Sequence, residues 1–262
     1  MRTSSAACLA LLPLLGGCTV VDAPESLEEL VVFGFEHFDD DASYLEAMGE
    51  NLFPRIDEHL DELAEGYHVD QLDEGHLAAA GVESPDAVSI IGALGAAHYT
   101  HGIEGALCGV IYPDKGEIFD NYLAYDLDDD GNLDCFLAGE CDRYETTADQ
   151  TVEVPVLGEA TQTVRRDFRW IRPRGADPFV VARSLAPDPI EFNTTVMEVD
   201  QQYALVVMVP HGDGTRRIET FWVEARVLGM DVPEYFAVTS AVTEMQDQAD
   251  RIDEWLDAGG GC

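Results

Sequence analysis

The stretch Asp231–Gly259, DVPEYFAVTSAVTEMQDQADRIDEWLDAG, decides the fold of this chain. Its apolar side chains recur at alternating steps of three and four residues, the period of one face of an α-helix: Tyr235, Val238, Val242, Met245, Ala249, Ile252 and Leu256. Asp231 and Glu234 form a capping-box pattern at its start, and Gly259 is placed to end it. The pattern predicts one helix over 232–258, whose apolar stripe must pack on another element.

The residues before this helix, from about 96 to 228, favour strands. Within 163–172 the apolar side chains fall on even positions, which is typical of a half-buried strand: Val164, Phe168 and Trp170. Further strands are predicted over 179–185, 195–199, 203–209 and 216–227. The turn cluster Pro210–Gly214 separates the last two and indicates a hairpin. Because such short connections cannot cross over to a parallel neighbour, the sheet is predicted to be antiparallel.

The N-terminal part, 27–92, is predicted to be mainly helical. One apolar stripe runs through 41–65 at helical spacing: Leu45, Met48, Leu52, Ile56, Leu60 and Leu63. Pro54 lies inside this stripe and predicts a kink or a split in the helix. Leu27–Phe38 fits either a buried strand or a first helix, and Ser84–Ile90 fits a further short helix.

An antiparallel β meander closed by one long C-terminal helix resembles the helix-grip architecture of START-like lipid-binding domains. The resemblance covers the last hundred residues and rests on the order of the elements, without a family sequence motif. It implies a single α+β domain over 27–262, in which the helix closes a curved sheet over an apolar cavity. Ordinary α+β packing with a filled core is the alternative.

The first eighteen residues indicate export. Met1–Arg2 is a short positive start, Ala6–Leu15 is an apolar run, and small residues lead to Cys18. The sequence Leu15-Gly16-Gly17-Cys18 resembles the lipobox of bacterial lipoproteins, in which this cysteine is acylated and becomes the new N-terminus. The resemblance implies a signal peptide over 1–17 and a lipidated tether over 18–26.

Membrane attachment is therefore expected through acyl chains such as palmitate on Cys18. No apolar stretch of about 20 residues follows the leader, so no transmembrane helix is predicted. Thr19 follows the cysteine, whereas an aspartate there would suggest retention at the inner membrane in many Gram-negative bacteria. We therefore expect a lipid-anchored protein of the bacterial cell envelope, at the outer membrane.

The charge of the chain limits its partners. There are 52 acidic and 14 basic residues, and the formal net charge is −38. This balance argues against nucleic acid as a partner, because phosphates require a basic surface. Five arginines nevertheless fall within ten residues: Arg165, Arg166, Arg169, Arg172 and Arg174. They could bind a phosphate or a lipid headgroup, but we favour pairing with carboxylates on adjacent strands.

Four cysteines remain after the leader and Cys18 are set aside: Cys108, Cys135, Cys141 and Cys262. Export to an oxidising compartment predicts disulfides, and three connectivities are possible. Cys135 and Cys141 enclose a short loop, which favours a bridge between them. Cys108 with Cys262 would then follow by elimination.

Acidic residues within 126–134 suggest a calcium loop. Oxygen ligands recur at loop positions one, three, five, seven and nine: Asp126, Asp128, Asp130, Asn132 and Asp134. With Gly131 at position six, the segment resembles EF-hand-type and related extracellular DxDxDG loops, which implies a structural calcium ion. It departs from them at position twelve, where Leu137 replaces the bidentate acid. The alternative is an acidic Asp-Gly turn.

A second candidate metal set is His98, His101 and Glu104. On a helix these side chains would share one face, whereas on a strand the two histidines would point to opposite faces. We favour two ordinary polar histidines. The sequence contains no GxSxG, Walker, Rossmann or CxxC motif.

These features predict a non-enzymatic binding module for an apolar small molecule or an envelope protein. The first alternative is an envelope hydrolase that uses paired carboxylates, although no pair is singled out in so acidic a chain. The second is a purely structural surface lipoprotein. A cavity between the final helix and the sheet would favour the binding module, and a filled core would favour the structural role.

Overall fold

The computed structural model describes residues 21–82, 91–155 and 157–262 of the 262-residue chain. Its helices are α1 (Leu27–Glu36), α2 (Ala42–Glu58), α3 (Leu60–Glu65), α4 (Glu74–Ala79), α5 (Ile103–Ile111), the 3-10 turn η1 (Lys115–Glu117), α6 (Leu133–Leu137) and α7 (Glu234–Asp257). Its strands are β1 (Tyr67–Val69), β2 (Ile91–Tyr99), β3 (Tyr122–Asp129), β4 (Arg143–Val154), β5 (Gly158–Ile171), β6 (Phe179–Ala186), β7 (Glu191–Phe192), β8 (Met197–His211), β9 (Gly214–Val227) and β10 (Met230–Asp231).

The described strands form one sheet in the order β1-β2-β9-β8-β6-β5-β4-β3, with the short strands β7 and β10 beside β5 and β9. Every pairing is antiparallel. From β3 to β9 the strands follow one another as a meander, and the predicted hairpin closes where His211 pairs with Gly214. The remaining long strand, β2, precedes the meander in sequence and pairs with its last strand, β9.

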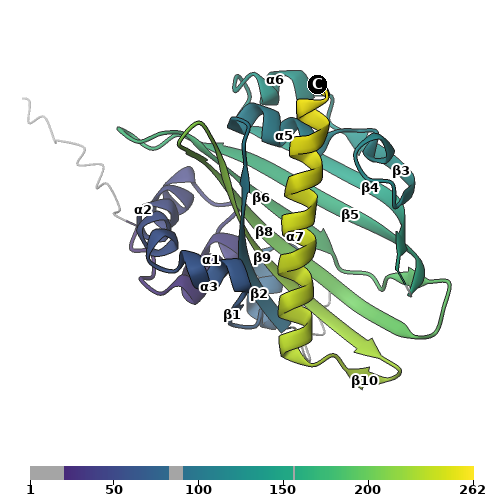
Figure 1. Cartoon of the computed structure of the whole chain (residues 1–262). Helices are drawn as coiled ribbons and strands as arrows, with labels where there is room; N and C mark the ends of the chain where they lie inside the picture. The colour runs from purple at the N-terminus through teal and green to yellow at the C-terminus, as the bar shows by residue number, and fades with distance from the viewer. Residues whose placement is uncertain (1–20, 83–90, 156) are drawn as a thin grey trace, which may run out of the picture.

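Two layers of helices cover the two faces of this sheet. Along β8, Leu205 and Val207 belong to a core with α1 and α2, whereas Val206 and Met208 belong to a core with α5 and α7. Because alternate residues of a strand point to opposite faces, these two cores lie on opposite sides. We call the side of α1 and α2 the outer face and the side of α7 the inner face. Figure 1 shows α7 lying across the sheet, with α5 and α6 near its C-terminal end.

The outer core contains a buried charge. Arg183 of β6 has no exposed side-chain surface, and its guanidinium lies 4.6 Å from the centre of the Phe38 ring. Its Nη2 donates to Oδ2 of Asp39 at 2.5 Å. Burial alone would raise the pKa of Asp39, but the Arg183 guanidinium holds that pKa below its usual value. The segment after α1 is thereby held to β6 by the charge pair between Asp39 and Arg183.

The α+β class and the order of elements agree with the prediction, and Leu27–Phe38 is resolved as a helix over most of its length. Of the predicted kink or split at Pro54, the split is wrong, because α2 continues through this proline to Glu58. The helix ends instead at His59, whose backbone N–H bonds to the carbonyl groups of Arg55 and Ile56. The predicted short helix Ser84–Ile90 lies outside the described residues.

The final helix is confirmed, but its predicted start is not. Pro233 occupies the N-cap position, and no side chain accepts a hydrogen bond from the first turn, so the capping box of Asp231 and Glu234 is wrong. Gly259 follows the helix with φ +93°, the left-handed conformation expected at a C-terminal glycine. Within the described ranges, no helix is both long and apolar enough to cross a lipid bilayer.

Candidate functional site

The apolar stripe of α7 lies against the inner face at close range. Its buried residues are Val238, Val242, Met245, Ala249 and Ile252. A Cβ atom on Gly95 of β2 would lie 2.7 Å from Cε of Met245, and one on Gly109 of α5 would lie 2.3 Å from Cγ2 of Ile252. The two glycines therefore allow the backbones of β2 and α5 to approach α7, which sets the position of the helix.

A cavity of about 90 Å³ lies between α7 and strands β2 and β9. Its apolar wall includes Ala93, Phe221 and Met245. Two carboxylates, Glu219 of β9 and Glu244 of α7, also line it. The cavity thus has an apolar wall with acidic groups at its border, and it lies where the helix-grip resemblance places an apolar cavity.

Arg217 of β9 neutralises one of these carboxylates. Its Nη2 lies 2.5 Å from Oε2 of Glu219, and its Nη1 donates to the Tyr99 hydroxyl at 3.1 Å. Burial alone would lower the pKa of Arg217, but the Glu219 carboxylate raises it above the usual value. Because Glu219 is held in this ion pair and Glu244 is exposed to solvent, these two acids are not a pair of facing buried carboxylates. The hydrolase alternative gains no support here.

Lys115 is a buried cation near Arg217. Its residue surface is only 3% exposed, and Nζ donates to the carbonyl oxygens of Gly109 at 3.0 Å and Val110 at 2.5 Å. Burial lowers the pKa of Lys115 well below its usual value, and the positive charges of Arg166 and Arg217 lower it further. The only lysine of the chain therefore lies inside the fold, where the positive charges of two arginines act on it.

Arg166 of β5 is the third cation of this group. In the sheet it lies opposite Thr146 of β4, and its Nη1 donates to the Tyr125 hydroxyl at 3.4 Å. Burial raises the pKa of the neighbouring Tyr122, and the charge of Arg166 opposes that rise. Further along the same two strands Gln150 pairs with Gln162, and within the described residues the Oε1 atom of each is buried without a hydrogen-bond partner. The inner face therefore carries polar groups with unused bonding capacity.

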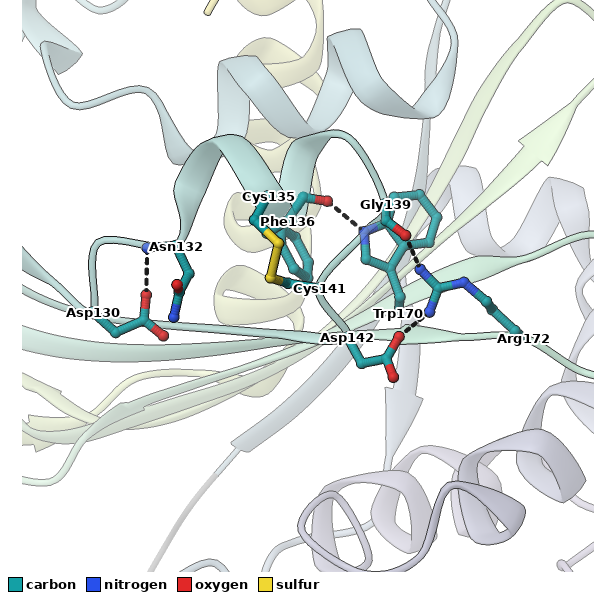
Figure 2. Close-up of a disulfide and its surroundings, with 9 residues drawn as sticks. All are labelled: Asp130, Asn132, Cys135, Phe136, Gly139, Cys141, Asp142, Trp170 and Arg172. Atoms are coloured by element: carbon teal, nitrogen blue, oxygen red, sulfur yellow. Dashed lines mark hydrogen bonds and ion pairs between the residues drawn. A yellow bond between two sulfur atoms is a disulfide. The ribbon is translucent and has the colours of Figure 1, made fainter.

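The five predicted calcium ligands do not converge. Strand β3 continues through Asp129, so Asp126 and Asp128 lie along an extended backbone and pair with Asp149 and Thr147 of β4. Asp130 accepts a hydrogen bond from the backbone N–H of Asn132, as Figure 2 shows. Among the described residues, no group of three or more His, Cys, Asp or Glu side chains is arranged to hold a metal ion. As placed here, these residues do not fit calcium, and the calcium loop stays a prediction.

Both disulfides expected from the sequence are present. Cys135 is bonded to Cys141, with Cα atoms 5.3 Å apart, and Cys108 is bonded to Cys262, with Cα atoms 5.7 Å apart. Figure 2 shows the first bridge beside Trp170, whose indole N–H donates to the Phe136 carbonyl at 2.8 Å. This bridge closes the α6 turn above the inner face of β5.

The arginine cluster divides between the two faces of β5. Arg165 pairs with Asp167, and Arg172 pairs with Asp142. Arg169 donates to the main-chain carbonyl of Asp40 at 3.0 Å rather than to a carboxylate. Arg172 and Arg165 thus pair with carboxylates, but only Arg172 does so across neighbouring segments, because Asp167 belongs to the same strand as Arg165. Arg166 differs because it points to the inner face.

The two candidate metal histidines are separated. His98 lies on β2, and its ring is 6.0 Å from that of His211. His101 lies beyond the strand, with Nε2 3.0 Å from Oδ1 of Asp257. Among the described residues, neither histidine belongs to a group arranged to hold a metal ion.

Cys18 lies outside the described residues, so its acylation stays a prediction. Lys115, Arg217 and Glu219 were not singled out from the sequence, because they are brought together only by the pairing of distant segments. One signal was available: a single lysine in a chain of this acidity, placed just after an apolar helix, is an unusual choice.

No family model and no curated protein matches the sequence. The chain is similar to the solved structure of a STAR-related lipid transfer protein from Xanthomonas axonopodis, with 13% identity over 66% of this chain and 97% of that chain and a TM-score of 0.39. It is similar to the Zhui aromatase/cyclase from Streptomyces, with 17% identity over 66% and 100% and a TM-score of 0.41. Human STARD10 is 11% identical over 79% and 80%, with a TM-score of 0.37. At these values the similarity does not extend to function.

Proposed function

We propose that this chain is a lipid-anchored envelope protein whose α+β domain binds an apolar small molecule between α7 and the inner face of the sheet. The observation that carries the proposal is the cavity lined by Ala93, Phe221 and Met245, directly under the final helix. Acyl chains on Cys18 would hold the domain at the membrane, since each buried methylene contributes roughly 0.8 kcal/mol. The domain would then work beside a source of apolar molecules.

The size of the cavity sets a condition on this function. Its volume of about 90 Å³ is below the roughly 300 Å³ of a site for a drug-sized ligand. A larger molecule therefore requires part of α7 to move away from the sheet. The C-terminal end of α7 is tied down through Cys262, whereas its N-terminal end has no side-chain cap. Movement of the N-terminal half would open the cavity at Ala93.

Exposed apolar side chains mark the same end of α7. Tyr235 is 83% exposed and Phe236 is 61% exposed, although both belong to the first turn of the helix. Exposed aromatic side chains at the N-terminal end of a helix supply apolar surface that a ligand or a membrane can cover. They therefore support the N-terminal half of α7 as the side from which a ligand enters.

The small volume of the cavity also favours one alternative, a structural surface lipoprotein with a filled core. The two functions differ in whether the interior accepts an added apolar molecule. A neutral apolar dye, N-phenyl-1-naphthylamine, distinguishes them because its fluorescence rises when it leaves water. We expect the wild-type chain to bind the dye with a saturable rise in fluorescence.

A matched pair of variants assigns the site. Ala93→Leu adds volume on the inner face, inside the cavity, and should weaken dye binding by about tenfold or more, because overpacking costs about 1–3 kcal/mol. Ala80→Leu makes the same change in the outer core, on the other side of the sheet, and should leave dye binding unchanged. Absence of binding to the wild type, or equal binding to Ala93→Leu, would contradict the proposal.

A further inference from the structure

A second, open hollow of about 290 Å³ lies on the outer face, between α3, β2 and the hairpin of β8 and β9. Ala96 of β2 packs on the outer core, and His98, two residues further along the strand, points to the same face. Leu60 and Ala64, one helical turn apart on α3, line the hollow as well. Its volume is close to the roughly 300 Å³ at which small-molecule sites begin.

The lining of this hollow differs in charge from the rest of the chain. Among the described residues, the lining contains no aspartate or glutamate, although the chain has 52 of them. It contains two imidazoles and a guanidinium instead: His98, His211 and Arg216. The other lining residues are one leucine and three alanines. Such a lining suits an anion that carries an apolar group.

Strand pairing brings the three basic side chains together. His98 lies directly opposite Arg216 in the ladder of β2 and β9, where side chains on one face are about 5 Å apart. Nη2 of Arg216 lies 2.8 Å from Nε2 of His211, and the ring centres of the two histidines are 6.0 Å apart. Gly214 leaves room for the His98 ring, since a Cβ atom there would lie 3.0 Å from Cε1 of that ring. The three groups therefore converge on one place at the edge of the hollow.

The contact with Arg216 also fixes the tautomer of His211. A guanidinium can only donate hydrogen bonds, so Nε2 of His211 accepts this bond and the proton of the neutral ring is on Nδ1. His211 thus keeps an N–H donor at Nδ1. Because a guanidinium stays charged at any physiological pH, the site offers one permanent positive charge beside at least one neutral donor.

A structural role explains only part of this arrangement. Nη1 of Arg216 donates to Oδ1 of Asp57 at 2.6 Å, which links β9 to α2. The Asp57 side chain is 66% exposed, whereas that of Arg216 is 12% exposed. An ion pair that is this open to water contributes little stability. A carboxylate from solution can therefore replace Asp57 on a guanidinium that the fold already holds in position.

We propose that this hollow binds a small monocarboxylate that carries an apolar group. The carboxylate accepts hydrogen bonds from Arg216 and lies beside the imidazoles, and the apolar group covers Leu60 and Ala96. A guanidinium can donate two parallel hydrogen bonds to a carboxylate. One negative charge matches the single permanent cation, whereas a second would meet the nearby Asp57. The site lies on the opposite face of the sheet from the cavity under α7, so this inference does not rest on the proposed function.

Benzoate and benzamide test the charge. The two probes have the same ring and nearly the same shape, but only benzoate is an anion. Binding is measured by titration calorimetry on the full chain carrying Cys18→Ala, which removes acyl groups that could compete. We expect benzoate to bind at least about tenfold more tightly than benzamide, the value of one charge-assisted hydrogen bond. Equal binding of the two probes, or no binding of benzoate, would overturn the proposal.

Ala93→Leu separates this site from the cavity under α7. The substitution fills that cavity, on the inner face, and should leave the affinity for benzoate unchanged. Loss of benzoate binding in this variant would place the anion under α7 and overturn the outer site. If the dye test of the proposed function fails while benzoate still binds, the outer site stands alone.

Substitutions in the hollow then test the residues. Arg216→Met should lower the affinity for benzoate to that for benzamide. Arg226→Met is the matched control on the same strand; Arg226 also pairs with carboxylates, those of Glu198 and Asp200, and its loss should keep the preference. Asp57→Asn should raise the affinity for benzoate by about two- to fivefold, because it removes the competing carboxylate. Retention of the preference in Arg216→Met, or an affinity that does not rise in Asp57→Asn, would overturn the assignment.

The imidazole signals exclude an indirect effect. In protein labelled with nitrogen-15 at histidine, the ring signals of His98 and His211 are assigned by their loss in His98→Gln and His211→Gln. Benzoate should shift both signals, benzamide should leave them in place, and benzoate should leave them in place in Arg216→Met. Signals of the parent chain that do not move when benzoate binds would contradict the proposed contact.

Discussion

Cys262, the last residue of the chain, is joined to Cys108 in the middle of α5. The bond ties the end of α7 to the helix that covers the same end of the inner face, across a sequence separation of 154 residues. It therefore closes residues 108–262, which contain the β meander and α7, into one covalent loop. The two sulfur atoms also fix the end of α7 about which we expect its N-terminal half to move.

Removal of this bridge should lower stability strongly. In the double variant Cys108→Ser/Cys262→Ser, the free energy of unfolding should fall by about 5 kcal/mol, because the unfolded chain regains the entropy of a loop of this length. Chemical denaturation under oxidising conditions measures the change. The double variant Cys135→Ser/Cys141→Ser is the control; its bridge closes a short loop, so the loss should be smaller. Equal losses in the two variants would contradict this account of the fold.

Gly95 sets the distance between β2 and α7. Gly95→Ala should destabilise the fold by about 1–3 kcal/mol, since the added Cβ would meet Val242 and Met245 in a packed core. Gly105→Ala in α5 is the control, because its nearest neighbour would be 3.4 Å away and alanine favours helix. Thermal unfolding followed by circular dichroism compares them. Unchanged stability in Gly95→Ala would show that α7 is not seated as described.

The Tyr67 hydroxyl donates to Oε1 of Glu28 at 2.5 Å, which links β1 to α1. This bond raises the pKa of Tyr67 to about 12 and lowers the pKa of Glu28. An unfolded tyrosine titrates near about 10. The folded state therefore holds the phenolic proton more tightly, and its contribution to stability is present below pH ~10 and lost as the pH rises to ~12.

Tyr67→Phe tests this link. At pH 7 the variant should be less stable than the wild type by about 1 kcal/mol, the net value of one hydrogen bond. Between pH 10 and pH 12, roughly the window set by the two pKa values, the difference should shrink toward zero. Denaturant unfolding at several pH values measures it, and charge repulsion common to both proteins cancels in the comparison. A difference that stays constant up to pH 12 would contradict the assigned bond.

The proposed lipid anchor is tested by expressing the full chain in a Gram-negative bacterium. Radiolabelled palmitate should mark the wild-type chain, and Cys18→Ser should abolish the label and leave the leader attached, because acylation precedes cleavage in the proposed processing. Cys8→Ser, a second cysteine change inside the leader, is the control and should keep the label. Labelled Cys18→Ser protein, or unlabelled wild type, would remove the membrane anchor from the account.

Local patterns predicted much of the fold. The stripe from Val238 to Ile252 and the turn after Pro210 depend on short-range periodicity, and both appear where the sequence indicated. Pro54 and the capping box were misjudged because tertiary packing overrides local preferences. The face of α2 that contains Leu52 and Ile56 is buried in the outer core, which holds the helix together through the proline.

The candidate site was largely beyond prediction. Lys115 and Arg166 are separated in sequence by strands β3 and β4 and helix α6, and only the closing of β2 onto β9 places α5 over the inner face. Five arginines within 165–174 attracted attention as a cluster, but alternation along β5 separates Arg166 from its neighbours. Asp126 and Asp128 show the reverse case, because their spacing indicated a loop but both belong to strand β3.

Native mass spectrometry of the protein released from its own membranes tests the central claim most directly. The account predicts an acylated chain that retains one non-covalently bound apolar small molecule, and loss of that mass in Ala93→Leu but not in Ala80→Leu. A wild-type chain that carries its acyl groups and no retained small molecule would contradict a binding function and favour a structural lipoprotein.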